Sequence, residues 1–432
     1  NDMSLQVRKI FHDYLTLDIS WINYVWGQKP FHTFKMLLLK DRENGSTTLQ
    51  FVKYYAKILR SLKNRFVLSS KEKEEILIFI DSLNHLRALA PIQKKLPNSV
   101  FWVDGAWTEG IFFPSDLARL IGLCSLPLLL IHYFRKHPLP HKWTLRYGLS
   151  AYLDAYGYFL IGRIFLKKLK PKILLVANDH SPQTRALIKA AQDLKIKTIY
   201  IQHAPVTKDF PPLEVDYALL EGEISVERYL KKNPECQISL VGISRRNIKW
   251  RLPKTLENQT LNIGIAFNDI DENETIEDLL SEIKKDKKLN FVLRPHPADL
   301  RRRKYFPDLA LKHDLRLSDP IKESSWDCLA QLDFIVAGHS GILLEAAFSG
   351  VIPLQHTNML KGFDHYNFQE AGITLVIQHL DEIKSLSEQI PQLQSNLKKP
   401  LQKFDATFDT PQEGKSSVIT ANLINEIVEA IS

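Results

Sequence analysis

Residues 291–297 read Phe-Val-Leu-Arg-Pro-His-Pro, and residues 338–345 read Gly-His-Ser-Gly-Ile-Leu-Leu-Glu. In the first segment an apolar run stops abruptly at Arg294 and His296. In the second, a glycine-rich loop around Ser340 follows an apolar run and precedes a helical pattern. Short continuous apolar runs are typical of strands that are buried on both faces of a parallel sheet. The two segments therefore predict two buried strands whose ends carry polar groups.

The alternation of short apolar runs and helical segments occurs in both halves of the chain. The runs of the first half lie at residues 76–80, 100–103, 172–177, 198–201, 217–220 and 238–241. Those of the second half lie at residues 262–267, 291–293, 334–336 and 351–354. Alternating strands and helices predict βαβ units and a parallel sheet. Two doubly wound halves in tandem would place a ligand cleft between the carboxyl ends of their strands.

The chain of 432 residues is long enough for two cores and a further segment. Residues 1–72 are rich in aromatic and basic side chains and contain helical spacing, which predicts a helical N-terminal extension. We expect residues 73–250 to form an amino-terminal domain and residues 251–432 a carboxy-terminal domain. The basic, irregular stretch at 244–258 is the candidate linker between them.

Charge and cysteine content limit the class of protein. A formal net charge of +8 favours anionic partners such as phosphates or anionic lipids. The basic residues are spread along the chain, which argues against a nucleic-acid-binding module. The three cysteines lie far apart and form no CxxC pair. This pattern predicts neither a disulfide framework nor a thiolate zinc site, and it suits a reducing cytosol.

The most apolar window covers residues 120–134 and is shorter than the ~20 residues that cross a bilayer. We interpret it as a buried helix. The alternative is a patch that lies on the membrane surface with its basic end against anionic headgroups. The sequence thus predicts a cytoplasmic protein without a transmembrane span, and the alternative adds peripheral contact with the inner face of the plasma membrane.

Arg294 and His296 are the first candidates for binding phosphate. At the end of a strand both side chains would face the cleft, and the flanking prolines restrict φ and stiffen the loop. Arginine offers a planar fork for phosphate oxygens. His296 can donate to a leaving phosphate oxygen as negative charge builds up there. The alternative is a surface loop held by prolines, with an incidental arginine.

The loop at 338–341 is the second candidate. Its glycines allow close approach to the backbone, and the helix that follows offers free N–H groups and the positive end of its dipole. Ser340 and Gly341 are therefore candidates for holding the phosphate, with His339 as a further candidate. Glu345 is placed to accept from ribose hydroxyls. In the alternative interpretation Ser340 is only a helix cap and Glu345 only a favourable first-turn charge.

Polar side chains also follow three predicted strands of the first half. His85, Asp179 and His203 each come shortly after one of these strands. Their loops would line the opposite wall of the cleft, where an acceptor hydroxyl needs a general base. We rank His203 first, then Asp179 and His85. The alternative for each of them is a structural role.

Two charged runs carry weaker signals. Asp269 and Asp271 have the spacing of a DxD metal site, but they lie in an acidic run that reads as a solvated loop and helix start. The basic run at 301–304 is interpreted as a solvated face, with contact to an anionic polymer or headgroup as the alternative. We expect no divalent metal, because cationic side chains and a helix end can neutralise a phosphate.

Together, the two doubly wound halves, the Gln-His-Ala-Pro motif at 202–205, the Arg-Pro-His-Pro motif at 294–297 and the segment 338–354 resemble bacterial GT-B glycosyltransferases that build surface polysaccharide. The pattern is similar to the sialyl-, polysialyl- and Kdo-transferases and to the CDP-glycerol glycerophosphotransferases. These families share a His-Pro motif and a later Ser motif for a CMP- or CDP-type donor. The resemblance implies that His296 stabilises the donor phosphate, that Ser340 binds it, and that Glu345 holds the ribose.

Two positions depart from these families. Ala204 stands where the glycerophosphotransferases have the glycine of a His-Gly motif. Val103 stands at the first position of the acidic pair that precedes glycine in the sialyltransferases, and Asp104 occupies the second.

The resemblance implies an α/β protein of the GT-B fold, with two Rossmann-like domains facing a central cleft. It also implies a transferase that moves a sugar from a nucleotide-activated donor, with a CMP-sugar favoured, to an oligosaccharide or lipid-linked acceptor. Such enzymes build surface polysaccharides such as capsule or lipopolysaccharide. The nucleotide sugar is then the co-substrate, and no other cofactor is expected. Two alternatives stay open: a CDP-polyol phosphotransferase, and an inactive GT-B scaffold protein.

Overall fold

The computed structural model describes residues 52, 54–56, 58, 59, 74–105, 108–127, 139–208, 210–231, 234–244, 260–268, 271–283, 286–297, 299 and 302–431. Most of the predicted extension (1–72) and of the candidate linker (244–258) lies outside these residues. The described residues form two compact units. The first takes in residues up to 203, 208–244 and 412–431, and the second takes in 204–207 and 260–411.

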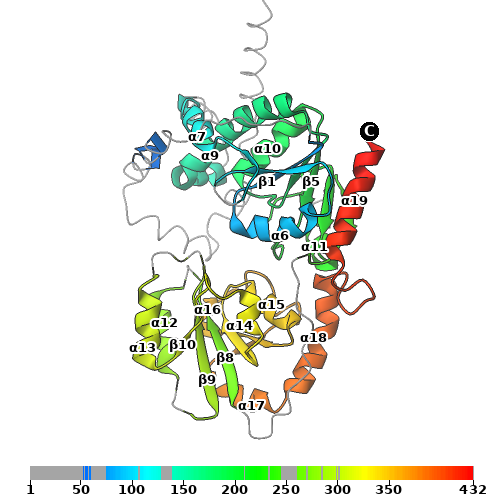
Figure 1. The fold of residues 1–432 in the computed structure, drawn as a ribbon. Coiled ribbons are helices and arrows are strands. Elements are labelled where there is room, and N and C mark those ends of the chain that lie inside the picture. Colours follow the sequence, from blue (N-terminus) through cyan, green and yellow to red (C-terminus); the bar gives the residue numbers. More distant parts are fainter. Residues whose placement is uncertain are drawn as a thin grey trace, which may run out of the picture. The chain divides into compact units, whose positions relative to one another are not determined.

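The first unit is built on a seven-stranded sheet in which all neighbouring strands are parallel (Figure 1). Its strands are β1 (Ile76–Ile80), β2 (Ser99–Val103), β3 (Ile111–Phe112), β4 (Ile173–Val176), β5 (Lys197–Ile201), β6 (Tyr217–Leu220) and β7 (Gln237–Leu240). They lie in the order β3-β2-β1-β4-β5-β6-β7. The helices are α6 (Leu83–Gln93), α7 (Ser115–Leu123), α9 (Leu139–Leu169), α10 (Pro182–Asp193), α11 (Glu223–Leu230) and α19 (Ser416–Ala430).

The second unit repeats this design on a six-stranded parallel sheet in the order β10-β9-β8-β11-β12-β13. Its strands are β8 (Leu261–Ala266), β9 (Leu289–Arg294), β10 (Arg316–Leu317), β11 (Phe334–Ala337), β12 (Ile352–His356) and β13 (Leu375–Ile377). The helices are α12 (Asn273–Ser281), α13 (Tyr305–His313), α14 (Ser325–Leu329), α15 (Ile342–Phe348), α16 (Thr357–Leu360), η2 (Leu380–Glu382), α17 (Ile383–Ser387) and α18 (Ile390–Phe404). The predicted parallel sheets are confirmed in both halves.

The strand β1 shows why the first sheet is covered on both faces. All of its residues are buried. Ile78 shares a core with Leu89 of α6 and Ile424 of α19. The ring of Phe79, on the opposite face, packs edge-on against Trp102, which stacks on Phe165 of α9. Full burial of an apolar side chain of this size contributes about 1.5–3 kcal/mol, so a polar residue in β1 would destabilise the fold.

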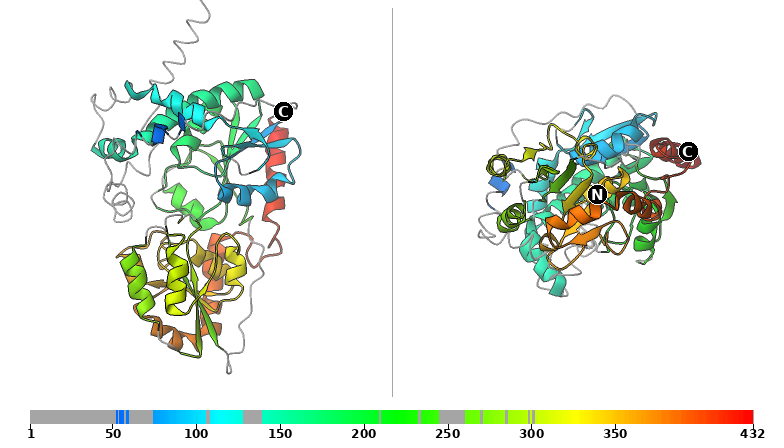
Figure 2. Two further views of the ribbon diagram at one scale, coloured as in Figure 1. Left: turned by 60° about the vertical axis from the view of Figure 1, so that its left-hand side comes forward. Right: turned by 90° about the horizontal axis from the view of Figure 1, so that it is seen from below.

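The last helix, α19, belongs to the first unit, although the chain reaches it only after completing the second. Figure 2 shows α19 (red) beside the blue elements that include α6. Ala421, Ile424 and Ile427 are buried in the core that contains β1 and β4. These residues recur at helical spacing, so one apolar stripe of α19 faces the sheet. The sequence assigned residues 251–432 to one domain, whereas the contacts group 412–431 with the first unit.

None of the helices in the described part of the chain combines the length and the apolar character that a bilayer crossing requires. The apolar window at 120–134 is described only up to residue 127, where α7 and the turn after it lie.

Candidate functional site

Each sheet has a topological switch point at its carboxyl edge. In the first sheet β1 lies between β2 and β4, and in the second β8 lies between β9 and β11. The connections on the two sides of such a strand run in opposite directions and leave a crevice, where ligands of open α/β sheets bind. The candidate residues named from the sequence follow these strands or near neighbours of them.

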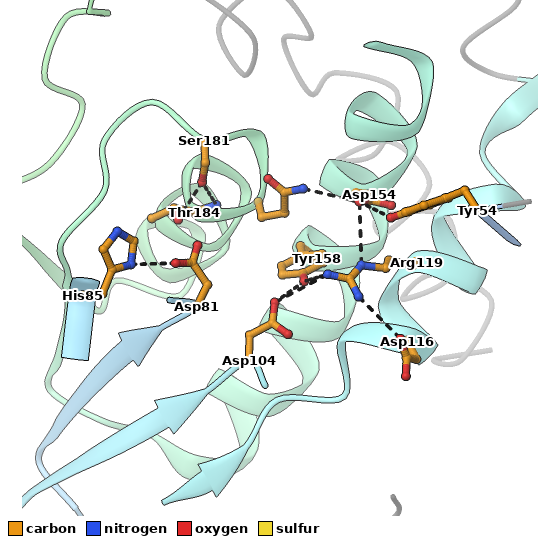
Figure 3. Close-up of polar contacts among 11 residues, drawn as sticks. Tyr54, Asp81, His85, Asp104, Asp116, Arg119, Asp154, Tyr158, Ser181 and Thr184 are labelled. Atoms are coloured by element: carbon orange, nitrogen blue, oxygen red, sulfur yellow. Dashed lines mark hydrogen bonds and ion pairs between the residues drawn. The ribbon is translucent and has the colours of Figure 1, made fainter. Parts of the chain in front are cut away.

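At the end of β1, Asp81 and His85 form a close pair (Figure 3). The Nδ1 atom of His85 lies 2.6 Å from Oδ1 of Asp81. Ser82 caps α6 between them, because its hydroxyl accepts from the His85 backbone N–H at 3.3 Å. In the tautomer that donates to this carboxylate, Nδ1 carries the proton and Nε2 is the ring nitrogen that can accept. The helix start and the carboxylate together fix the orientation of this imidazole.

His203, after β5, lies beside His85. The two ring centroids are 4.6 Å apart, and the ring planes are nearly perpendicular at 83°. His85 is buried and His203 is half-buried. The structure therefore brings together two of the three amino-domain residues that the sequence singled out.

Asp179, after β4, is the third of these residues, and its carboxylate is already engaged. One oxygen accepts from the Tyr229 hydroxyl of α11, and the other lies 3.0 Å from Nδ1 of His180. Arg185 donates to the Asp179 carbonyl at 2.8 Å. Burial raises the pKa of Tyr229 well above its usual value, so the phenol keeps its proton and donates. Asp179 thus ties α10 and α11 to the end of β4.

A charged cluster lies next to the Asp81–His85 pair. Its residues were not predicted as site residues from the sequence. Asp104, at the end of β2, accepts from the Tyr158 hydroxyl of α9 (Figure 3). The Arg119 guanidinium of α7 lies 3.9 Å from Asp104 and 3.4 Å from Asp116. Burial raises the pKa of Asp104. Its position directly after a strand was the signal that could have identified it.

Asp154, on α9, completes this cluster. It lies 3.8 Å from Nε of Arg119 and accepts from the Tyr54 hydroxyl at 2.7 Å and from Gln183 at 3.3 Å. Burial raises the pKa of this carboxyl to about 6. Asp154 lies inside an apolar helical stretch, where nothing in the sequence pattern distinguishes it.

Close contact between α7 and α9 places the cluster. A Cβ atom on Gly157 would lie 1.6 Å from the Ala118 carbonyl oxygen, and one on Gly122 would lie 2.1 Å from that of Leu153. Only glycine allows the two backbones to approach this closely. Arg119 follows Ala118 directly in the sequence, so this contact brings its guanidinium to Asp154 and Tyr158.

In the second unit, a hydrogen bond joins the two loops of the switch point. The side-chain amide of Asn268, after β8, donates to the His339 carbonyl, after β11, at 2.7 Å. Gly338 permits this path, because a Cβ atom there would lie 2.7 Å from the Met359 carbonyl oxygen. The loop that starts at Gly338 is therefore held from both sides.

The buried side chain of His339 stabilises this loop. It is buried, its Nε2 lies 3.0 Å from the Leu360 carbonyl, and its Nδ1 accepts from the His365 backbone N–H at 3.5 Å. Its ring stacks on Phe363 with 4.3 Å between centroids. Burial lowers the pKa of His339, so the ring is neutral near pH 7. These contacts make His339 a support for the loop.

Ser340, Gly341 and Glu345 line the outer side of the same loop and helix. All three are half-buried. The Ser340 hydroxyl accepts from the Ile342 N–H at a long 3.4 Å, and no atom lies within 4 Å of a Cβ placed on Gly341. Among the described residues, none forms a hydrogen bond or ion pair with the Glu345 carboxylate that would occupy it.

Arg294 and His296 differ in their surroundings. Arg294 is buried, and its guanidinium donates to Ser318 Oγ at 2.5 Å and to the Glu323 carbonyl at 3.0 Å. It thereby ties the end of β9 to the segment after β10. His296 is half-buried and lines a small pocket with neighbours that include Pro295, Pro320 and Ile321. Arg294 is thus engaged within the unit, whereas His296 lines the pocket.

Arg302 joins three loops at this edge. Its Nε lies 2.5 Å from Asp299, and its other nitrogens donate to the carbonyls of Asp271 at 2.6 Å and Asn268 at 2.7 Å. The interpretation of the basic run as a solvated face is therefore wrong for Arg302, because backbone carbonyls and a carboxylate surround its guanidinium. Asp269 of the DxD motif lies outside the described residues. Asp271 accepts from the Asn268 N–H at 2.6 Å as part of a turn.

No family model matches the chain, and comparison with curated proteins gives no match. Solved structures match it in fold. UDP-GlcNAc 2-epimerase from Neisseria meningitidis bound to UDP-GlcNAc is 15% identical, covers 81% of this chain and 99% of its own, and has a TM-score of 0.51. MnaA from S. aureus in complex with UDP is 13% identical, with coverages of 82% and 97% and a TM-score of 0.50. The glycotransferase of kitacinnamycin is 13% identical, with coverages of 81% and 98% and a TM-score of 0.51.

These similarities and the two doubly wound sheets show that the chain has the GT-B fold. The fold class predicted from the sequence is confirmed on this point: each half is a Rossmann-like unit.

Proposed function

We propose that this protein is a glycosyltransferase that moves a sugar from a nucleotide-activated donor to a hydroxyl of a saccharide or lipid-linked acceptor, in the synthesis of a surface polysaccharide. One observation carries the proposal: polar side chains with the chemistry that a transferase needs lie at the switch point of each Rossmann-like unit. The second unit has His296 and Ser340 on the two sides of β8. The first has the oriented Asp81–His85 pair at the end of β1.

The donor diphosphate or monophosphate is proposed to lie over the end of β8. Neighbouring strands are about 4.8 Å apart, so the ends of β9 and β11, which His296 and Ser340 follow, are separated by roughly 10 Å. That span suits a phosphate group with the ribose attached to it. The open Gly341 lets the phosphate approach the backbone, and Glu345 is within one turn of it to accept from ribose hydroxyls.

The nucleobase is proposed to be a pyrimidine. The resemblance in sequence favours a CMP-sugar, and two structural neighbours were solved with UDP or UDP-GlcNAc. Cytidine and uridine share the pyrimidine ring.

In the proposed reaction His85 accepts the proton of the acceptor hydroxyl on Nε2. The acceptor oxygen forms the new bond to the sugar C1 atom as the bond from C1 to the donor phosphate oxygen breaks. His296 donates to that departing oxygen and stabilises its charge. Arg294 and His339 hold the two donor loops in place without touching the substrate.

The first test is donor binding and turnover in a His296→Ala variant. We expect the variant to bind nucleotide and to fold normally, while turnover falls by ~10²-fold or more, as on loss of a donor to a developing oxyanion. The matched control is His379→Gln, which alters an exposed histidine of the same unit. Calorimetric titration with UDP, CDP, CMP and ADP measures the preference for pyrimidines. Wild-type turnover in His296→Ala would remove His296 from the mechanism.

We also propose that no divalent metal takes part, because His296 and the start of α15 can neutralise the phosphate. Turnover in the presence of EDTA is expected to equal turnover without it. Loss of activity that Mg²⁺ or Mn²⁺ restores would contradict this.

A second candidate is an epimerase acting on a nucleotide sugar. The carboxylates Asp81 and Asp104, on neighbouring strand ends, favour it, because removal and return of a proton on a sugar carbon needs an acid and a base. Incubation of UDP- and CMP-sugars without acceptor, followed by NMR of the sugar ring, separates the two. An inverted ring carbon indicates an epimerase, and a new glycosidic bond that forms only with acceptor indicates the transferase. A phosphodiester product would indicate a CDP-polyol phosphotransferase, and absence of nucleotide binding an inactive scaffold.

A further inference from the structure

A lysine-rich pocket lies at the amino edge of the first sheet, which is the edge opposite to the switch point. It is lined by Leu166, Lys167, Lys170, Pro171, Lys172, Leu194, Lys195, Ile196, Lys197 and Ile431. These residues come from the end of α9, the end of α10, the starts of β4 and β5, and the end of the chain segment that contains α19. Five separate elements therefore contribute to one hollow, which we call the lysine pocket.

The charge of the lysine pocket is only partly balanced. Lys172 pairs with Glu75 at 2.6 Å, and Lys197 pairs with Asp216 at 3.1 Å. Among the described residues, no carboxylate forms an ion pair with the other three lysines, Lys167, Lys170 and Lys195. Their ammonium groups create a positive field that attracts an anion.

The backbone conformation at two of these lysines is one that favours glycine. Lys170 has φ 52° and Lys195 has φ 60°, which is the left-handed region that glycine adopts most easily. Lys195 ends α10 in a Schellman arrangement, in which its N–H donates to Gln192 and the next N–H donates to Ala191. Lysine near a helix C-terminus also stabilises the helix dipole. That effect accounts for the lysines at the ends of α9 and α10, whereas Lys172 and Lys197 stand at strand starts, where each forms one ion pair and lines the same hollow.

The remaining walls are apolar. Leu166, Pro171, Leu194, Ile196 and Ile431 supply them. The side chains of Lys167, Lys170 and Lys195 are exposed, so their attraction for an anion is strongest at low salt. Lysine binds phosphate as a point charge without demanding one geometry.

We propose that the lysine pocket binds a phosphate-bearing anion, at a site separate from the donor and acceptor sites proposed above. Free phosphate compounds and phospholipid headgroups present the same group to it. This inference does not depend on the proposed transfer reaction.

The test uses a Lys170→Gly, Lys195→Gly double variant of the full chain. Glycine relieves the left-handed backbone at both positions, so folding is expected to be as stable as in the wild type or more stable. Loss of two ammonium groups is expected to weaken pyrophosphate binding by about fivefold at low salt. The control is Lys398→Ala, Lys399→Ala, which removes the same charge from exposed positions of α18 in the second unit.

Pyrophosphate titration and flotation with vesicles of phosphatidylcholine, with and without phosphatidylglycerol, identify the source of the phosphate. Binding of pyrophosphate alone supports a soluble ligand, and binding of the anionic vesicles alone supports a headgroup. Either kind of binding supports the proposal if the glycine variant loses it and the control keeps it. The proposal is overturned if the wild type binds neither probe, or if the glycine variant and the control lose binding equally. Retained nucleotide binding in the glycine variant separates this outcome from any failure of the donor site.

Discussion

A histidine acts as a base only when the nitrogen that faces the substrate lacks a proton, and Asp81 sets this condition for His85. Their 2.6 Å contact holds the proton on Nδ1. We expect His85→Gln to lower kcat by ~10²–10⁴-fold, the range for loss of general acid–base catalysis. Asp81→Asn acts through His85, so a smaller loss of kcat is expected.

Nucleotide affinity is the control in this experiment, because neither residue lies in the unit that holds the donor loops. A His85→Gln variant with unchanged kcat would exclude His85 as the base. His203, whose ring adjoins it, would then be the next candidate.

Asp154 makes the protein less stable as the pH rises, which is the reverse of the usual effect of an aspartate. Burial raises the pKa of its carboxyl to about 6, whereas an aspartate in an unfolded chain has a pKa of about 3.9. The folded state therefore binds this proton more tightly than the unfolded state. Its contribution to stability is full below pH ~4 and is lost as the pH rises through about 6. The loss amounts to at most about 3 kcal/mol of the free energy of unfolding.

Urea denaturation of the wild type and of Asp154→Asn between pH 4 and pH 7 measures this contribution, because asparagine cannot ionise. Other titrating groups affect both proteins alike. The stability of the wild type relative to the variant is expected to fall across this range. Two curves that stay parallel would show that Asp154 titrates as it does in water.

At the scale of elements, the crossing of α7 and α9 is a tight packing contact. Gly157→Ala would place a Cβ atom 1.6 Å from the Ala118 carbonyl oxygen, so the helices must move apart. We expect a loss of about 3 kcal/mol or more in the free energy of unfolding, at the upper end for an overpacked core. Thermal or urea denaturation measures it.

Gly341→Ala is the matched control for this change, because no atom lies within 4 Å of the added methyl group and its φ of −63° suits alanine. Its stability should stay near that of the wild type. Equal losses in the two variants would show that the α7–α9 contact is looser than described. Displacement of Arg119 in Gly157→Ala would also disturb its contacts with Asp104 and Asp154.

At the scale of the whole molecule, the chain closes the first unit with its last helix. Ile424 of α19 is fully buried against the first sheet. We expect Ile424→Ala to cost about 2–5 kcal/mol, the range for a large-to-small change in a core. Hydrogen exchange should report this loss in the strands of the first unit, such as β1 and β4. Faster exchange in β8 and β11 instead would show that α19 packs against the second unit and would contradict this assignment.

Several elements were predictable because their signal is local. The strand at 76–80 has the bounds expected from the sequence, and most other strands agree within two residues. A run of apolar residues between polar turns leaves few other structures for such segments. The helices α18 and α19 were not predicted individually, and β3 and β13 are too short for a clear pattern.

The positions of the candidate site residues were predictable from the sequence, but their hydrogen-bond and ion-pair partners were not. The sequence indicated that polar groups follow the strands, and it named His85, Asp179 and His203. It ranked His203 above His85, although the Asp81 contact singles out His85. The functional roles of these residues and of His296, Ser340 and Glu345 stay predictions.

By itself, the sequence determined the two doubly wound halves and the strand ends on which polar loops lie, because hydrophobic periodicity and parallel βαβ order are properties of neighbouring residues. Only the tertiary structure decided which charged groups meet. Arg294 is bound to Ser318, and Arg119 lies among three carboxylates, because helix packing and loop paths bring together residues far apart in the chain. A side chain can bind a ligand only through hydrogen-bond donors and acceptors that its neighbours do not occupy. A local sequence pattern does not identify those neighbours.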